Sequence, residues 1–176
     1  VILGVAFVTV FIMFAGYRGD RIQAFLHPET AGDKGYQTLM GLYAIGSGGL
    51  FGKGLGESLQ KLGNVPESQN DMIFTIICEE LGLFGAICLM LLFVLLIWRM
   101  MVIANNAKDL YGSLIVVGAM AHIAIQVILN IAVVTKTIPN TGVILPFISY
   151  GGTASLFLLA ELGIVFNISS QIRLER

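Results

Sequence analysis

Charged residues are scarce in this sequence: Asp, Glu, Lys and Arg make up 12% of its 176 residues, whereas 56% are hydrophobic. A soluble domain usually carries about 25% charged residues. Mean hydropathy is +0.86, which indicates that lipid solvates much of the chain. The net charge of −1 provides no basic field of the kind that attracts nucleic acid, so we expect no nucleic-acid partner.

Cysteine is also scarce. Cys78 and Cys88 are the only cysteines in the sequence, and both lie in one apolar run. Along a helix they would be roughly 15 Å apart, which is too far for a disulfide. We therefore expect both to be reduced packing residues.

Long apolar runs are abundant. A bilayer-spanning helix needs about 20 mostly apolar residues, and residues 1–16, 72–98, 111–134 and 145–169 meet or approach this requirement. The first run has no initiator Met, charged leader or signal-cleavage site. The sequence therefore predicts an all-α, polytopic membrane fold with four membrane helices, and we expect it to be the C-terminal part of a longer protein.

A long polar loop, residues 17–71, separates the first two predicted membrane helices. Loops of this length are usually functional or partly ordered. Residues 36–45 have a pattern compatible with a short helix, and residues 46–56 contain a dense run of glycines. Glycine permits positive φ and the close approach of another molecule. The same run also fits a flexible turn against the membrane, and the pattern favours neither interpretation.

Basic residues lie in the connection 99–110 and in the tail 170–176. Short segments rich in Lys and Arg stay in the cytoplasm, whereas long loops obey this rule poorly. We therefore predict that both segments are cytoplasmic, and that the loop 17–71 and the connection 135–144 are extracellular. The residues concerned are Arg99, Lys108, Arg173 and Arg176; Arg18 and Arg21, beside the first helix, favour the opposite orientation.

Common catalytic motifs are missing. Lys53 follows a glycine, as in a phosphate-binding P-loop, but Ser47 replaces the first glycine of that motif and Gly54 replaces its Ser or Thr. The sequence also lacks an HExxH motif, a Cys/His cluster and a Gly-x-Ser-x-Gly elbow. These absences argue against a nucleotide site and against the common zinc and serine hydrolases.

Several polar residues lie inside predicted membrane helices, where they are costly unless they face a partner or a cavity. Three are acids, for which we weigh structural pairing against catalysis. Three others recur at i, i+4 and i+8 and so share one helical face, which fits either interhelical hydrogen bonding or a proton or substrate path. The acids are Glu79, Glu80 and Glu161; the polar stripe is His122, Gln126 and Asn130.

Asp71 ends the long loop and precedes the second membrane helix. It could cap that helix together with Asn70, because an anion is favoured at a helix N-terminus. An ionised carboxylate at the membrane interface could equally accept a proton from a sugar hydroxyl. Position alone makes Asp71 eligible for both roles.

Two motifs of this sequence are distinctive. After Pro66, residues 67–82 read ESQNDMIFTIICEELG, and residues 140–152 read NTGVILPFISYGG. They resemble the PEAHTDFIFAVIGEELG and TG-x-x-LPF-x-SYGG motifs of the SEDS family, which includes FtsW, RodA and a sporulation homologue. Further matches are spread along the chain in the family's order. Residues 126–138 look closer to division or sporulation members than to elongation members.

The resemblance implies the last four helices of a ten-helix fold in the bacterial cytoplasmic membrane, with a large extracellular loop containing short helices. It implies a peptidoglycan glycosyltransferase that polymerises lipid II, inverts the anomeric carbon and releases undecaprenyl diphosphate. The implied partners are lipid II, the growing glycan strand and a class B penicillin-binding protein within a division or elongation complex. Lacking six helices, the fragment would be inactive alone.

The resemblance also implies roles for individual residues. Asp71 aligns with the family's essential loop aspartate, so it becomes the candidate general base. The candidates for binding substrate, including its diphosphate, are Arg18, Arg21, Lys53, Lys61, Glu79 and Glu80. A divalent cation, Mg²⁺ or Mn²⁺, could accompany the diphosphate, although no ligand cluster identifies its site. No organic cofactor is expected.

The chain departs from the family pattern at two places. His27 stands before Pro28 where the family often has Asp, and Gln69–Asn70 replaces His-Thr before Asp71. We therefore expect altered local hydrogen bonds in the loop. Two other functions remain open: a transporter of lipid-linked precursor, whose path Glu79, Glu80, Glu161 and His122 would line, and a non-catalytic division scaffold.

Overall fold

The computed structural model of the chain describes residues 22, 24–29, 32–62 and 68–172. Every regular element there is a helix, as the predicted all-α class requires. The predicted membrane helix at residues 1–16 lies outside the described residues, as do Arg18, Arg21, Arg173 and Arg176. The elements are α3 (Gly32–Ser47), the 3₁₀ helix η1 (Gln60–Leu62), α4 (Ile73–Asn105), α5 (Leu110–Val134) and α6 (Gly152–Ser170).

Helices α4, α5 and α6 are long and apolar enough to cross a membrane. Their outer faces expose many large apolar side chains, among them Phe84, Leu92 and Phe157. Soluble monomers rarely expose apolar surface of this extent, whereas lipid solvates it readily. The prediction of a polytopic membrane protein is confirmed for these three helices.

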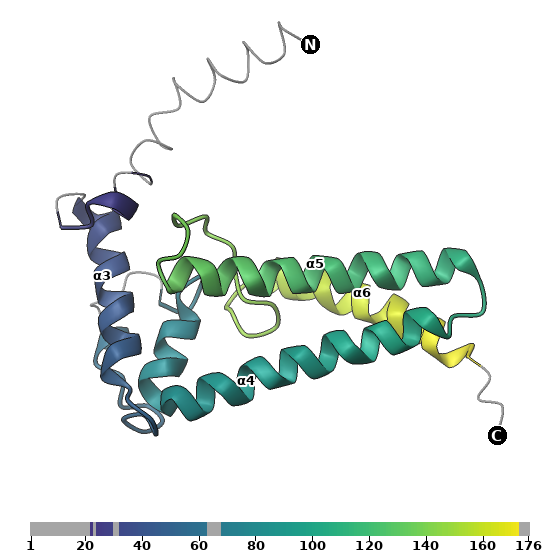
Figure 1. Ribbon diagram of the computed structural model, residues 1–176, viewed down its shortest axis with the longest axis horizontal. Helices are drawn as coiled ribbons and strands as arrows, with labels where there is room; N and C mark the ends of the chain where they lie inside the picture. The colour runs from purple at the N-terminus through teal and green to yellow at the C-terminus, as the bar shows by residue number, and fades with distance from the viewer. Residues whose placement is uncertain (1–21, 23, 30–31, 63–67, 173–176) are drawn as a thin grey trace, which may run out of the picture.

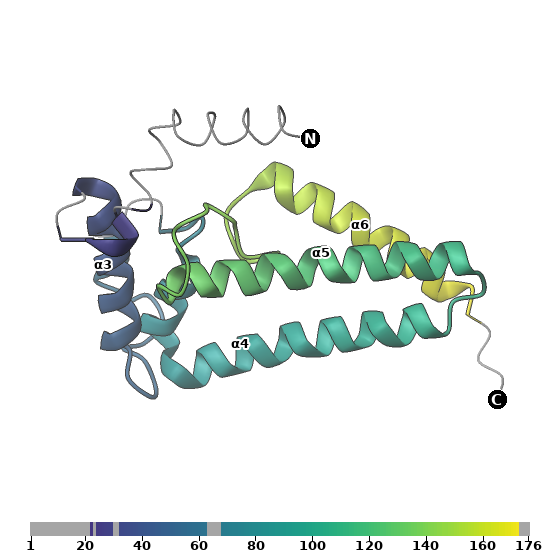
Figure 2. The same ribbon diagram turned by 45° about the horizontal axis from the view of Figure 1, so that its top comes forward.

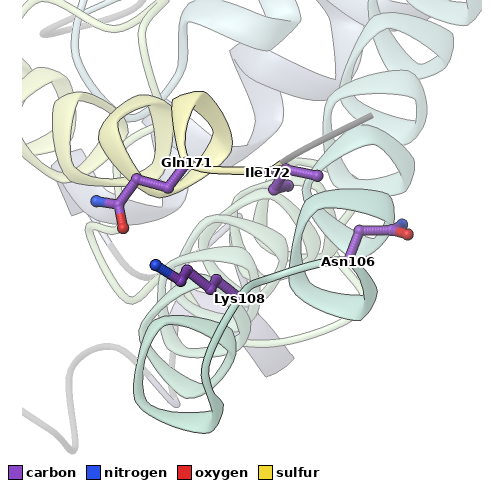
Figure 3. Close-up of a pocket in the computed structure, with 4 residues that line it drawn as sticks. All are labelled: Asn106, Lys108, Gln171 and Ile172. Atoms are coloured by element: carbon purple, nitrogen blue, oxygen red, sulfur yellow. The ribbon is translucent and has the colours of Figure 1, made fainter. Parts of the chain in front are cut away.

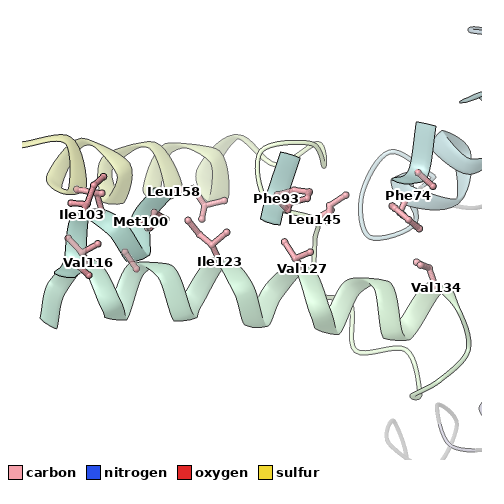
Figure 4. Packing of buried hydrophobic residues seen from close by; sticks show 14 of the residues in the cluster. Phe74, Phe93, Met100, Ile103, Val116, Ile123, Val127, Val134, Leu145 and Leu158 are labelled. Carbon is pink, nitrogen blue, oxygen red and sulfur yellow. The ribbon is translucent and has the colours of Figure 1, made fainter. Parts of the chain in front are cut away.

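The three membrane helices form a layered bundle, and α3 crosses one end of it (Figures 1 and 2). Helices α4 and α5 run antiparallel because residues 106–109 alone connect them, and the Asp109 side chain caps α5 by accepting from Gly112 N–H at 3.0 Å. The buried face of α5 presents Ile123 and Val127 toward α4 and α6 (Figure 4).

Two helix boundaries differ from the predicted ones by more than one residue. Helix α4 continues to Asn105 rather than ending at residue 98, because the apolar pattern has no breaker there. Helix α6 begins at Gly152 rather than at residue 145. Residues 145–151 are apolar enough to resemble a membrane helix, but Phe147 has φ 63 and the Leu145 carbonyl accepts from Ser149 N–H in a turn. A left-handed residue is incompatible with a continuous helix.

Candidate functional site

Helix α4 is broken at Gly82, where φ is 66 and ψ is −165. A regular helix would join Leu83 N–H to the Glu79 carbonyl and Phe84 N–H to the Glu80 carbonyl. The break separates both pairs. Four main-chain polar groups inside an apolar helix therefore need other partners, because unpaired buried groups are costly.

Residues 48–54, here called the glycine loop, satisfy all four groups. This loop runs against the break and replaces the two missing helix bonds by four of its own. Its donors and acceptors are both main-chain atoms, so the side chains of the loop remain available for other contacts. The bonds run from Lys53 N–H to Glu79 O (2.9 Å), Gly54 N–H to Glu80 O (3.0 Å), Leu83 N–H to Gly49 O (2.9 Å) and Phe84 N–H to Leu50 O (3.1 Å).

Glycine is required on both sides of this contact. A Cβ on Gly48 would collide with the Cys78 carbonyl, and a Cβ on Gly52 would collide with the Glu80 carbonyl. A Cβ on Gly82 would collide with the main chain of the glycine loop. The glycine run is therefore used for close approach, as one interpretation predicted, but the molecule that approaches is the chain's own helix α4.

The acids beside the break are paired with two lysines of the long loop (residues 17–71). Lys53 Nζ lies 2.6 Å from Glu79 Oε1, and Lys61 Nζ lies 2.7 Å from Glu80 Oε1. Glu79 is fully buried, and its second oxygen accepts from Ser58 Oγ at 2.5 Å. Both acids are thus paired, as the structural interpretation predicted. Their roles, and those of Lys53 and Lys61, as substrate ligands remain predictions, and each of these charges already has a partner.

Asp71 is half-buried in the turn that precedes α4. The N-cap residue of α4 is Met72, so the prediction that Asp71 or Asn70 occupies the cap position is wrong. The turn is bound from two sides. Asn130 of α5 donates to the Asp71 carbonyl at 2.8 Å, and Tyr150 N–H donates to the Gln69 carbonyl at 2.8 Å. Asp71 thus lies where the loop, α5 and the α5–α6 connection (residues 135–151) meet.

The polar stripe predicted on α5 divides into two sites. His122 Nδ1 lies 3.0 Å from Glu161 Oε2 of α6, and Gln126 Nε2 lies 2.9 Å from His122 Nε2. The first contact confirms interhelical hydrogen bonding between α5 and α6, whereas the second lies within α5. Asn130, two turns further along, is fully buried and binds main-chain carbonyls near Asp71 instead. The sequence periodicity placed these residues on one face and could not separate their partners.

A hollow of about 390 Å³ lies at the other end of the bundle (Figure 3). It is lined by Asn106, Lys108, Gln171 and Ile172 where α4 and α6 end. Helix C-termini carry partial negative charge and disfavour anions. One lysine beside two such termini makes a poor site for a diphosphate, so this hollow does not compete with the Asp71 region.

The donor set for a metal ion is also poor. Within the described residues, no group of three or more His, Cys, Asp or Glu is placed to hold a metal. The two neighbouring carboxylates beside the glycine loop, Glu79 and Glu80, are engaged by lysine ammonium groups. These residues do not fit a resident metal ion.

Comparisons with known proteins place this geometry in context. A family model described as a cell cycle protein, named for FtsW, RodA and SpoVE, matches residues 1–174. Stage V sporulation protein E of Bacillus subtilis is 48% identical over 163 residues, covering 92% of this chain and 44% of that protein. A probable peptidoglycan glycosyltransferase FtsW of Trichlorobacter lovleyi is 43% identical over 169 residues, covering 96% of this chain and 44% of that protein. The chain therefore spans less than half the length of these relatives.

Two solved structures share the fold. A variant of the rod shape determining protein RodA of Thermus thermophilus matches with a TM-score of 0.59 and 30% identity, over 77% of this chain and 41% of that one. A chain from a peptidoglycan synthase complex that coordinates polymerization and crosslinking matches with a TM-score of 0.65 and 21% identity, over 99% of this chain and 50% of that one. The second likeness is one of fold alone.

Proposed function

The chain belongs to the FtsW/RodA/SpoVE family of cell cycle proteins, and from this we propose that it is the part of a peptidoglycan glycosyltransferase that holds the catalytic base. The observation that carries the proposal is the placement of Asp71. This carboxylate is half-buried at the start of a membrane helix, in a turn held by two other segments of the chain. Several relatives named FtsW are described as probable peptidoglycan glycosyltransferases.

In the proposed reaction, Asp71 accepts the proton of the sugar 4-hydroxyl of lipid II. That oxygen attacks the anomeric carbon of the growing strand, and undecaprenyl diphosphate leaves with the electron pair of the broken bond. The α-linked donor becomes a β-1,4 linkage, so the configuration inverts and no covalent glycosyl-enzyme is needed, as in inverting glycosidases. The base must stay ionised, which suits a carboxylate that water can reach.

The leaving diphosphate requires cationic stabilisation. Lys53 and Lys61 each neutralise a glutamate. We therefore assign Lys53 to holding the glycine loop against α4, and Lys61 to holding η1 against α4. Arg18 and Arg21 lie outside the described residues and remain the proposed cations for the diphosphate. A divalent cation brought with the substrate is compatible with this assignment.

The proposal also includes a location and a partner. The glycine loop and Asp71 face the outside of the bacterial cytoplasmic membrane, and residues 106–109 face the cytoplasm. The partner is a class B penicillin-binding protein that cross-links the new strands in division or sporulation. This partner assignment rests on membership of the family.

The test is glycan polymerisation from lipid II by the full-length protein, purified with its transpeptidase partner. We expect Asp71→Asn to lower the rate by at least about 100-fold, because general base catalysis contributes roughly 10²–10⁴-fold. Glu57 is an exposed acid of the long loop (residues 17–71) that also contains Asp71. Glu57→Gln is therefore the matched control and should retain the rate.

Three other outcomes would contradict the proposal. Undiminished polymerisation by Asp71→Asn would refute the base assignment. A wild type that moves lipid II across liposome membranes without polymerising it would support the transporter, for which the intramembrane His122–Glu161 contact would be the candidate path. A wild type that does neither would support the scaffold.

A further inference from the structure

We propose that Asn130 is a positioning residue for the Asp71 carboxylate, an inference that rests on the proposed function above. Asn130 lies on α5, 59 residues from Asp71 in the sequence, and it is fully buried. Nothing in the sequence pattern distinguishes it from His122 and Gln126 on the same face. The structure gives it different partners.

The side-chain amide of Asn130 joins two segments of the chain. Its Nδ2 donates to the Asp71 carbonyl and to the Val143 carbonyl, each at 2.8 Å. Because both neighbours are acceptors, only the NH₂ group can face them, and the orientation of the amide is determined. The amide therefore ties the turn before α4 to the connection that follows α5.

The cost of this arrangement falls on the other amide atom. Asn130 Oδ1 is buried and has no hydrogen-bond partner among the described residues. Buried polar atoms without partners are uncommon in folded proteins. Gln126 Oε1 is buried without a partner as well, so the two carbonyls that the Asn130 amide binds, rather than its unpaired oxygen, distinguish Asn130.

Asn130 is well placed to hold Asp71 still. The neighbouring α5 residues Val127, Val133 and Val134 are buried in the bundle, so the helix is anchored at this level. The contact is made with the main chain of Asp71 itself, whereas the Tyr150 N–H holds Gln69, two residues away. The main chain of the proposed base is therefore bound directly to the membrane helix α5. A displacement of about 1 Å at a reacting group can cost about 100-fold in rate.

The experiment compares three variants of the full-length protein with its transpeptidase partner. Asn130→Leu removes both donors and keeps the number of side-chain heavy atoms, although the leucine is bulkier, and Asn130→Ser retains one donor in a smaller side chain. Gln126→Leu, one turn away on the same helix, removes an amide that binds His122 rather than the site. Lipid II binding stoichiometry and affinity are measured first, so that kcat is expressed per molecule able to bind lipid II.

We expect Asn130→Leu to lower this kcat roughly 10- to 100-fold, with KM for lipid II changed less than about threefold. Asn130→Ser should give an intermediate kcat, and Gln126→Leu should match the wild type. Should Asn130→Leu not fold, Asn130→Ser decides by the same criterion.

A merely structural role would reduce the number of molecules that bind lipid II and leave kcat per bound molecule unchanged, which would overturn the inference. The failure of the proposed function looks different. In that case the wild type does not polymerise, or Asp71→Asn remains active. An active wild type, an inactive Asp71→Asn and a fully active Asn130→Leu would refute the positioning role alone.

Discussion

Glu79 is the charged residue of the site whose side chain is fully buried, so leaving it without a partner would strongly destabilise the fold. Its carboxylate is fully buried between the Lys53 ammonium group and the Ser58 hydroxyl. A buried charge is tolerated when it is paired and hydrogen-bonded, and it becomes strongly destabilising when one partner is removed. Through Lys53 and Ser58, Glu79 therefore binds loop side chains to α4. This contact lies beside the break at Gly82, where the main chain of the glycine loop supplies the missing hydrogen bonds.

Lys53→Met should destabilise the protein by roughly 3 kcal/mol, at the lower end of the range for a buried pair because Lys53 keeps 31% of its side chain exposed. Unfolding in detergent, monitored by the loss of the helical circular dichroism signal, measures the change in the free energy of unfolding. Lys53→Met combined with Glu79→Gln should recover part of the loss, because it removes the unpaired charge.

Lys61→Met is the matched control, since its pair with Glu80 is more exposed on the glutamate side. Solvent-exposed pairs contribute about 1 kcal/mol or less. Equal losses from the two lysine substitutions would show that burial of Glu79 is not what makes its pair important.

At the scale of elements, the glycine loop and the broken helix α4 form one unit. Neither satisfies its main-chain polar groups alone: the break at Gly82 exposes two carbonyls and two N–H groups, and the loop supplies their partners. The first part of α4, before the break at Gly82, lies at an angle to the long part of the helix (Figure 1).

Gly52→Ala and Gly82→Ala should each destabilise this unit by about 2–4 kcal/mol, because positive φ and collision with main-chain atoms act together. Limited proteolysis should show faster cleavage within residues 48–62. Gly46→Ala is the control: Gly46 lies in α3 with open space around its Cβ position, so alanine should be neutral or stabilising by up to about 1 kcal/mol. Equal protease resistance in all three variants would refute the role of the glycine loop.

Element boundaries show how far local sequence pattern reaches. Residues 111–134 were predicted as a membrane helix, and α5 spans Leu110–Val134, because nothing interrupts the apolar run. Residues 145–151 were predicted as helix and are not, because the turn at Leu145 and the left-handed Phe147 depend on docking against the turn before α4. Hydropathy reports solvent preference and does not report such docking.

At the scale of the whole molecule, the two ends of the bundle differ in chemistry. One end carries Asp71 and the glycine loop, and the other carries Lys108 and the helix C-termini of α4 and α6. The distribution of Arg and Lys between short connections predicts that the Lys108 end is cytoplasmic. The proposed reaction requires the Asp71 end outside.

Cysteine labelling tests this orientation in a full-length protein in which Cys78 and Cys88 are replaced by alanine. Leu55→Cys, at a position 78% exposed in the loop, should react with a membrane-impermeant maleimide in intact spheroplasts. Lys108→Cys should react only after permeabilisation. The reverse pattern would place the glycine loop in the cytoplasm and contradict the proposed extracellular reaction.

The sequence by itself determined the helical membrane class and the family, because run length, hydropathy and the order of motifs are properties of neighbouring residues. It also singled out Asp71, through the motif that contains it. Only the tertiary structure decided which residues of the chain contact one another. Lys53 meets Glu79 across 26 residues, and Asn130 meets Asp71 across 59. Both contacts depend on a broken helix and a docked connection, which arise when distant segments satisfy one another's buried polar groups.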